Sequence, residues 1–460
     1  MLKPKVGFIV YGVHKDGLKD PSGDPFIDEK IVESSLKSLA GRGVEIVRHD
    51  VVVATKREAA QALKPFRDDD GIDAVLLFSG TWVWASHMVA AIQDFSRTGK
   101  GVLIWTHPGS QGWRPVGGFV LHGGLMEIGV GHKFVYGAAD DVREMDAIVS
   151  FLRASCLKNR LNMSTIGAFG GRGMGQTCGV ADPSQWMRTF GVDIDSRDTT
   201  ALIERAKSIP QADVRSMAPR FRELFDKVPE FSDVNERSIR MYLALKQIVA
   251  EEEFDFYTIQ SFPGMADDYT ATCFAQSMML DDGIPTSTLS DFNTAMTVYL
   301  LTHLSDSPVY YGDLQHFDKQ TREMKIIGDG AIPPSLAYEG SKATFAEHGI
   351  PTEGGAGGLS VDVVSKAGAG VLARLGRVNG EFAMVLARCQ VFVPDPSELM
   401  KRRAECGIPF WPHAFATMDC DMDVLLENWN NEYGCLGYGE HIYDAIVDFC
   451  KLTGIRCIRP

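Results

Sequence analysis

Two aspartates occupy positions in this sequence where an α/β enzyme would place acid–base or metal-binding groups. The segment "GIPTSTLSDFNTAMTVYLLTHLSDSPVYYGDLQHF" reads as strand, helix and strand, with Asp291 after the first strand and Asp313 at the end of the second. A carboxylate at a strand tip can bind a divalent cation or act as a general base. We therefore predict that Asp291 and Asp313 are catalytic residues at the tips of neighbouring strands.

Asp291 also has a structural interpretation. A helix with apolar periodicity is predicted over residues 294–302, directly after this aspartate. Aspartate is among the residues that best cap a helix N-terminus, so Asp291 is equally suited to that role. Asp313 has no predicted helix immediately after it, which favours a functional role there.

A glycine-rich loop, "FGGRGMGQTCG" (169–179), lies between a predicted strand and a predicted helix. Backbone amides in such a loop can hold an anion or sugar oxygens, and the alternative is a tight turn without a ligand. The cationic Arg172 and the apolar Met174 favour a substrate-binding loop. Because the spacing differs from the GxGxxG dinucleotide signature, no nucleotide cofactor is expected.

The elements that would position these residues fall into three predicted domains. Residues 1–160 alternate buried strands with amphipathic helices, which is typical of a doubly wound parallel sheet. The pattern starts again over residues 161–315, with "STIGAFGG" as its first strand and "VYYGDL" as its last. Residues 316–460 are richer in glycine and β-prone runs, with a hairpin signal at Asn379-Gly380 and a terminal helix and strand. The predicted fold is α/β, with two Rossmann-like domains and a β-rich C-terminal domain.

The composition excludes several classes of function. A net charge of −14 and a pI near 5.3 argue against nucleic-acid binding, which requires clustered lysine and arginine. No apolar run approaches the roughly 20 residues of a membrane helix. Nine cysteines without a CxxC pair indicate reduced thiols and a cytoplasmic protein. Histidines are scattered without HxH or HxxxH spacing, which favours structural roles for most of them.

Four stretches, in the same order along the chain, resemble the L-fucose/L-arabinose isomerase family. They are "IGAFGGRGMGQTCGVADPSQWMRTFGVDIDSRDTTALIERA", the segment from Gly283 to Asp313, "AGVLARLGRVNGEFAMVLARCQ" and "ENWNNEYGCLGYGEHIYDAIVDFCKLTGIRCI". The resemblance implies the same three-domain fold, a homo-oligomer (trimer or hexamer), and aldose–ketose isomerisation of a sugar through an enediol. It also implies a Mn²⁺ ion held by two acidic residues and a histidine.

Carried over residue by residue, the resemblance leaves that metal triad incomplete. The second acidic ligand matches Asp313, but the first falls on Leu289 and the histidine falls on Tyr433. Leucine cannot bind a cation, and a tyrosine hydroxyl with a pKa near 10 is a poor ligand at neutral pH.

Three outcomes remain open from the sequence. In the first, Mn²⁺ or Mg²⁺ is held by other oxygen ligands, drawn from Asp291, Asp313, Asp329 and Glu432. In the second, Asp313 works as a base without a metal, and Tyr433 or Arg172 stabilises an oxyanion. In the third, the chain only binds a sugar. The metal-free site would suit an isomerase, an epimerase or a lyase. The other expected substrate contacts match Met174, Gln260 and Glu432. We predict a sugar isomerase, with the metal-independent lyase or epimerase and the non-catalytic sugar-binding protein as alternatives.

Overall fold

The computed structural model describes residues 2–13, 27–109, 113–348, 357–405 and 409–460. These residues form two compact units. The N-terminal unit comprises Leu2–Arg160 together with Asp444–Gly454, and the C-terminal unit comprises Leu161–Tyr443 together with Ile455–Pro460. The predicted domain boundary near residue 315 lies inside the C-terminal unit and stays a prediction.

The N-terminal unit is built on a five-stranded parallel sheet with the strand order β2-β1-β3-β4-β5. The strands are β1 (Lys5–Tyr11), β2 (Glu45–Arg48), β3 (Ala74–Ser79), β4 (Gly101–Thr106) and β5 (Lys133–Tyr136). The helices are α1 (Glu29–Gly41), α2 (Lys56–Asp68), α3 (Ala85–Ser96), α4 (Arg114–Glu127), α5 (Val142–Leu161) and α16 (Ile442–Thr453). Because β3 and β4 are buried along their whole length, the sheet must be covered on both faces.

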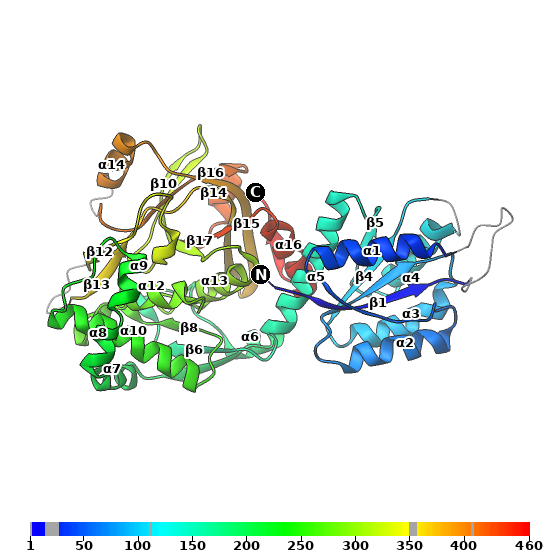
Figure 1. Cartoon of the computed structure of the whole chain (residues 1–460), viewed down its shortest axis with the longest axis horizontal. Helices are drawn as coiled ribbons and strands as arrows, with labels where there is room; N and C mark the ends of the chain where they lie inside the picture. The colour runs from blue at the N-terminus through cyan, green and yellow to red at the C-terminus, as the bar shows by residue number, and fades with distance from the viewer. Residues whose placement is uncertain (1, 14–26, 110–112, 349–356, 406–408) are drawn as a thin grey trace. The chain divides into compact units, whose positions relative to one another are not determined.

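Two apolar clusters provide that cover. One joins α1 and α5 to one face of the sheet, and the other joins α2, α3 and α4 to the opposite face. Figure 1 shows α1 on one side of β1 and β4, and α2 and α3 on the other. The predicted parallel α/β layering is therefore confirmed for this unit.

The C-terminal unit contains a second, four-stranded parallel sheet in the order β7-β6-β8-β9. The strands are β6 (Thr165–Phe169), β7 (Asp193–Arg197), β8 (Phe256–Ile259) and β9 (Thr286–Ser287). The helices of this part are α6 (Pro183–Phe190), α7 (Thr199–Ser208), α8 (Gln211–Ser216), α9 (Ala218–Leu224), α10 (Asp233–Glu251), α11 (Ala266–Asp268), α12 (Cys273–Asp281) and α13 (Phe292–Leu304). α13 packs against β8 and β9 and also against β14 and β17, so it joins this sheet to the next.

The third sheet is mixed, with the strand order β14-β17-β10-β11-β16-β15-β18. Its strands are β10 (Tyr310–Asp318), β11 (Glu323–Ile327), β14 (Gly368–Val378), β15 (Glu381–Phe392), β16 (His413–Asp419), β17 (Tyr433–Tyr438) and β18 (Arg456–Ile458). An additional pairing of β14 with β15 closes six of these strands into an antiparallel barrel. The turn between β14 and β15 is the predicted hairpin, with Asn379 and Gly380 both at positive φ.

Four further elements of this unit are the paired strands β12 (Thr344–Glu347) and β13 (Leu359–Asp362), and the helices α14 (Pro396–Ala404) and α15 (Met422–Asn428). β13 contacts α10 and α12, and α15 contacts β15 of the barrel. Within the described ranges, no helix combines the length and apolar character that crossing a membrane requires.

One predicted pairing is corrected by the structure. The segment ending in Asp313 was expected to be the last strand of the parallel sheet, next to the strand that precedes Asp291. Instead β10 pairs antiparallel with β11 and β17, and Asp313 is its fourth residue rather than its tip. Asp313 therefore lies in the mixed sheet, whereas Asp291 follows β9, the two-residue edge strand of the parallel sheet, as the N-cap of α13.

Candidate functional site

A cavity of about 290 Å³ lies in the C-terminal unit. Loops that follow β6, β8 and β9 line it, and so do residues on or next to β10, β11 and β17. Ligands of open α/β sheets bind outside the carboxyl ends of parallel strands, which is the position of the first three loops. The predicted site residues that line it are Met174, Asp313, Asp329, Glu432 and Tyr433, together with Leu289.

Antiparallel pairing explains why Asp313 and Tyr433 meet. They are direct cross-strand partners of β10 and β17, so their side chains share one face of the sheet. On the other side of β10, Asp313 pairs with Ile327, the last residue of β11, and Asp329 follows two residues later. Three strands that are adjacent in the sheet thus bring two carboxyl groups and one phenol to the same cavity.

The carboxyl group of Asp313 has an unusual protonation equilibrium. Burial, together with a smaller effect of the nearby Asp329 and Glu432 carboxylates, raises its pKa to about 7. Burial also raises the pKa of Asp329. A general base is most effective when its pKa lies near the working pH, so Asp313 suits proton transfer at neutral pH.

Tyr433 presents a neutral hydroxyl. Burial raises its pKa well above the ordinary value, and the Asp329 and Asp313 charges act in the same direction. Its oxygen accepts a hydrogen bond of 3.0 Å from the Thr288 hydroxyl, which leaves the phenolic proton for another acceptor. Tyr433 can therefore donate a hydrogen bond to an oxygen of a bound molecule, but it is a poor nucleophile and would bind a metal ion poorly.

The loops that close the cavity hold strained backbone. Met174, Leu289 and Ser290 all have positive φ although none is glycine. The loops press closely together, because a Cβ added at Gly173 would lie 2.3 Å from the Leu289 carbonyl oxygen. Strain of this kind persists where the surrounding structure imposes it, which is characteristic of binding sites.

Asp291 lies apart from the residues that line the cavity. It is completely buried and caps α13, accepting a hydrogen bond of 2.9 Å from the Thr294 amide. Its other oxygen accepts from Arg374 at 2.9 Å and from Asn431 at 2.7 Å. These contacts correspond to the N-cap interpretation, extended by a buried ion pair that the sequence did not indicate.

Arg172 and Gln260 also fall outside the lining residues. Arg172 is exposed at the start of the turn that carries Met174. The Gln260 side chain accepts a hydrogen bond of 2.9 Å from the Gly171 amide, so in this structure it shapes the loop after β6. Gln176 of the same loop donates a hydrogen bond to Glu432. The loop is thereby held next to the cavity.

Three further chemically active residues line the cavity: Cys273, His348 and Trp411. Cys273 begins α12, and its Sγ lies 3.7 Å from Nδ1 of His348, which follows β12. The 75-residue separation of this pair matches no short motif, so sequence spacing gave no sign of it.

The donor set does not reproduce the three-ligand metal site that the resemblance implies. Asp313 and Asp329 are suitable oxygen ligands for Mn²⁺ or Mg²⁺, and the unpaired Oδ1 of Asp329 would accept a cation. Leu289 and Tyr433 occupy the other two ligand positions. Across the described ranges, no three or more His, Cys, Asp or Glu side chains are grouped closely enough to hold a metal ion. A bound metal stays a prediction for analysis of the purified protein.

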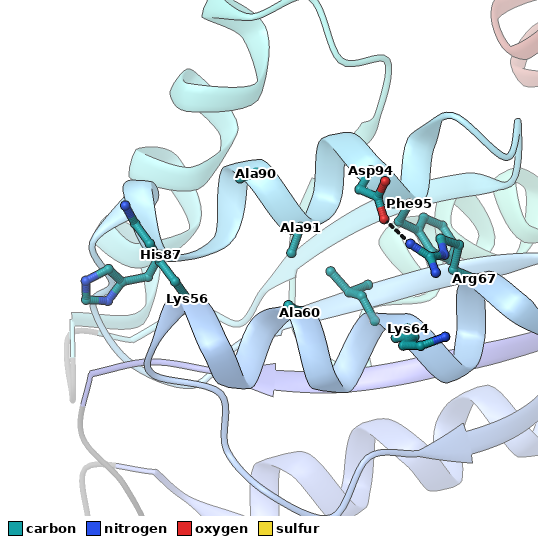
Figure 2. A pocket seen from close by; sticks show the side chains of 10 residues that line it. Lys56, Ala60, Lys64, Arg67, His87, Ala90, Ala91, Asp94 and Phe95 are labelled. Atoms are coloured by element: carbon teal, nitrogen blue, oxygen red, sulfur yellow. Dashed lines mark hydrogen bonds and ion pairs between the residues drawn. The ribbon is translucent and has the colours of Figure 1, made fainter.

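A second hollow, of about 370 Å³, lies between α2 and α3 of the N-terminal unit. Figure 2 shows alanines along this hollow and an ion pair of Arg67 with Asp94 at one end. Lys64 is likewise paired, with Asp68 on its own helix. Lys56 and His87 line its other end. Its described lining has one carboxyl group, the paired Asp94, in contrast to the three carboxyl groups of the cavity at Asp313.

Comparison with known proteins adds independent information. No protein-family model matches the chain. A sulfoquinovose isomerase from Clostridium sp. (strain MSTE9) is 26% identical over 219 residues, which cover 47% of this chain and 48% of that protein. Sulfoquinovose isomerases from Priestia aryabhattai and Priestia megaterium (strain ATCC 12872 / QMB1551) are 21% identical over 340 residues, or 71% of this chain and 75% of each relative.

The match to the first relative thus spans about half the length of that protein. Among solved structures, a periplasmic solute-binding protein from Actinobacillus succinogenes 130z with bound D-allose aligns with 66% of this chain and 92% of its own, at 9% identity and a TM-score of 0.19. A score this low supports no inference.

The isomerase relatives support the prediction of an enzyme of the sugar-isomerase type, and the assignment to the fucose/arabinose isomerase family stays a prediction.

Proposed function

We propose that this chain interconverts an aldose and a ketose through an enediol in the cavity around Asp313. The observation that carries the proposal is a carboxyl group with a pKa of about 7 in a ligand-sized cavity, opposite a neutral tyrosine hydroxyl. The sulfoquinovose isomerase relatives support the same reaction class.

The reaction requires a base that can remove a proton from carbon and return it. In its ionised form Asp313 removes the hydrogen on C2 of the open-chain aldose, and the carbonyl oxygen on C1 gains negative charge. The Tyr433 hydroxyl donates a hydrogen bond to that oxygen. Asp313, now protonated, gives its proton to C1. The C2 hydroxyl loses its proton as C2 becomes the ketone carbon, and O1 gains a proton to become the C1 hydroxyl. Because the same carboxyl group removes the proton from C2 and returns it to C1, both transfers take place on one face of the sugar.

The size of the cavity favours a monosaccharide. Ligand pockets usually measure about 300–1,000 Å³, and this cavity, at about 290 Å³, is just below the lower limit of that range. Its lining combines three carboxyl groups with the aromatic side chains of Phe262, Trp411 and Tyr433. Hydroxyl groups of a sugar can donate to the carboxylates, while aromatic faces pack against its C–H surface.

Isomerisation in deuterium oxide tests this proposal against its alternatives. An isomerase forms the ketose and incorporates solvent deuterium at the carbon next to the carbonyl. An epimerase would give a C2 epimer, and a lyase would give two fragments. Saturable sugar binding without exchange of any carbon-bound hydrogen would contradict catalysis and leave a sugar-binding protein. Metal content, measured on the same sample by mass spectrometry, decides whether Mn²⁺ or Mg²⁺ takes part.

Arg172 supports a more specific substrate class, a sugar with an anionic substituent. The guanidinium is exposed on the loop that also supplies Met174 to the cavity, and the described lining residues include no lysine or arginine. A sulfonate or similar group at the end of the sugar far from the reacting carbons would avoid the carboxylates and pair with Arg172. The similarity to sulfoquinovose isomerases supports the same substrate chemistry.

Replacing Arg172 by glutamine tests that assignment. We expect the KM for sulfoquinovose to rise about tenfold, the effect of losing about 1.4 kcal/mol of charge pairing. The KM for glucose, which has a neutral hydroxyl at the same carbon, should be unaffected. Arg188→Gln, which removes an exposed arginine from α6, is the matched control. Equal changes for the two sugars would contradict a role in anion recognition.

A further inference from the structure

An aldose–ketose isomerase must move two protons, one between carbons and one between oxygens. Asp313 accounts for the carbon-bound proton in the reaction proposed above. The proton that leaves the C2 hydroxyl and the proton that reaches O1 need a second group, and that group must be able both to give and to take a proton. Carboxylates next to Asp313 are poorly suited, because O1 gains negative charge during the reaction.

Two described lining residues bear an N–H donor: His348 and Trp411. Neither His348 Nε2 nor Trp411 Nε1 has a hydrogen-bond partner in the described structure, and both atoms are buried. A buried nitrogen without a partner destabilises the fold, so its retention needs an explanation such as a ligand that supplies the partner. An indole can only donate, whereas an imidazole can donate a proton and accept it back.

Cys273 determines which imidazole nitrogen bears the hydrogen. Burial raises the pKa of the Cys273 thiol well above its ordinary value, and the nearby Asp329 adds to this effect, so the sulfur keeps its proton. Burial lowers the pKa of His348, so the ring is neutral at pH 7. Either atom of the 3.7 Å contact can be the donor, depending on the tautomer of the ring. Because an imidazole nitrogen accepts a hydrogen bond better than a thiol sulfur does, we assign the thiol as the donor to Nδ1. The hydrogen of the neutral ring is then on Nε2, the nitrogen without a protein partner.

We propose that His348 is the second acid–base residue of the isomerase, and that Cys273 is a positioning residue that fixes its tautomer. This assignment rests on the function proposed above. Asp313 takes the C2 proton, and the electron pair of the C2–H bond forms the C1–C2 double bond. The π electron pair of the C1 carbonyl moves to O1, and O1 takes the proton from Nε2 of His348. The C2 hydroxyl then returns a proton to Nε2, the pair of its O–H bond forms the C2 carbonyl, and Asp313 delivers its proton to C1. Both residues end as they began, and no other reactant is consumed.

Chemical rescue of His348→Ala provides the test. We expect kcat to fall about 10²–10⁴-fold with KM changed only a few-fold, because the ring acts on protons rather than on binding. Added imidazole should restore activity with saturation, since it fills the space that the side chain leaves. His348→Gln keeps a donor but cannot shuttle a proton, so it should stay as slow as His348→Ala. The matched control is His316→Ala, which removes an exposed histidine of β10 that does not line the cavity.

Cys273 is tested by rescue with a conservative variant. Cys273→Ala should lower kcat about tenfold without a matching change in KM, and Cys273→Ser, which keeps an O–H donor to Nδ1, should recover most of that loss. If the wild-type protein forms no ketose and incorporates no deuterium, the proposed function fails. If the wild type is active but folded His348→Ala keeps its kcat, or loses activity that imidazole does not restore, the role of His348 is overturned.

Discussion

Replacing Asp313 by asparagine is expected to lower kcat by about 10²–10⁴-fold, the usual contribution of a positioned general base. Asparagine keeps the shape and the hydrogen-bonding capacity of the side chain, so KM should change little. The variant should also fail to incorporate solvent deuterium into the sugar. Steady-state kinetics and mass spectrometry of the recovered sugar measure both effects.

The same substitution is expected to stabilise the fold at alkaline pH. The folded protein holds the Asp313 proton up to about pH 7, whereas an unfolded aspartate loses it near pH 3.8. Stability of the wild type therefore falls as the pH rises between these values, and the uncharged variant does not share this loss. A difference of about three pKa units between the folded and unfolded states limits this loss of folding stability to about 4 kcal/mol. Partial exposure of the side chain makes the loss smaller.

Thermal unfolding at pH 4 and at pH 8 measures this difference. We expect the two proteins to have similar stability at pH 4 and the asparagine variant to be the more stable at pH 8. Asp423→Asn, at an exposed carboxylate of α15, should change neither activity nor the pH dependence. An Asp313→Asn protein that is slower but no more stable at pH 8 would show that the charge of Asp313 is compensated in the folded state.

The regular parts of the fold could be predicted from the sequence because their patterns are local. Continuous Val, Ile and Leu runs mark the parallel strands, and local signals bound α6, with Pro183 in its first turn and Gly191 after its last residue. α4 was not predicted, since its sequence "RPVGGFVLHGGLME" contains four glycines, which are poor helix formers. β5 was also missed, because it is short and partly exposed.

The pairing of β10 could not be predicted because its turn lacks the usual residues. β10 and β11 are joined across residues 319–322, and Arg322 rather than glycine or asparagine takes the positive φ there. Without a turn signal, the buried start of β10 resembled one more parallel strand. In the structure Asp313 and Tyr433 line one cavity as cross-strand partners, and their catalytic roles stay predictions.

The second half of the site depends on irregular structure. Cys273 starts a helix after a short turn, and His348 follows an isolated two-stranded pair. Neither position has a periodic pattern, and only the tertiary fold brings the two side chains together. Composition and spacing could therefore indicate the carboxylates of the cavity but not the thiol–imidazole pair.

Replacing Asp291 by alanine is expected to cost about 3–5 kcal/mol of stability, because it leaves the Arg374 guanidinium buried without its counter-charge. Both side chains are at most 1% exposed. Asp182→Ala is the matched control, since Asp182 also caps a helix, α6, but is exposed and has no buried ion pair. Loss of a cap alone costs about 1 kcal/mol. Chemical denaturation measures both differences.

Arg374→Met combined with Asp291→Ala separates the ion pair from the cap. The double variant removes both charges, so it should recover stability relative to Asp291→Ala while still lacking the cap at Thr294. If Asp291 acted as a catalytic partner of Asp313, the single variant would keep its stability and lose kcat. We expect the reverse: folded Asp291→Ala protein should keep measurable turnover, because the carboxylate contacts Arg374, Thr294 and Asn431 instead of the cavity. The buried pair then fixes the start of α13, the helix that joins the parallel sheet to the strands β14 and β17 of the barrel.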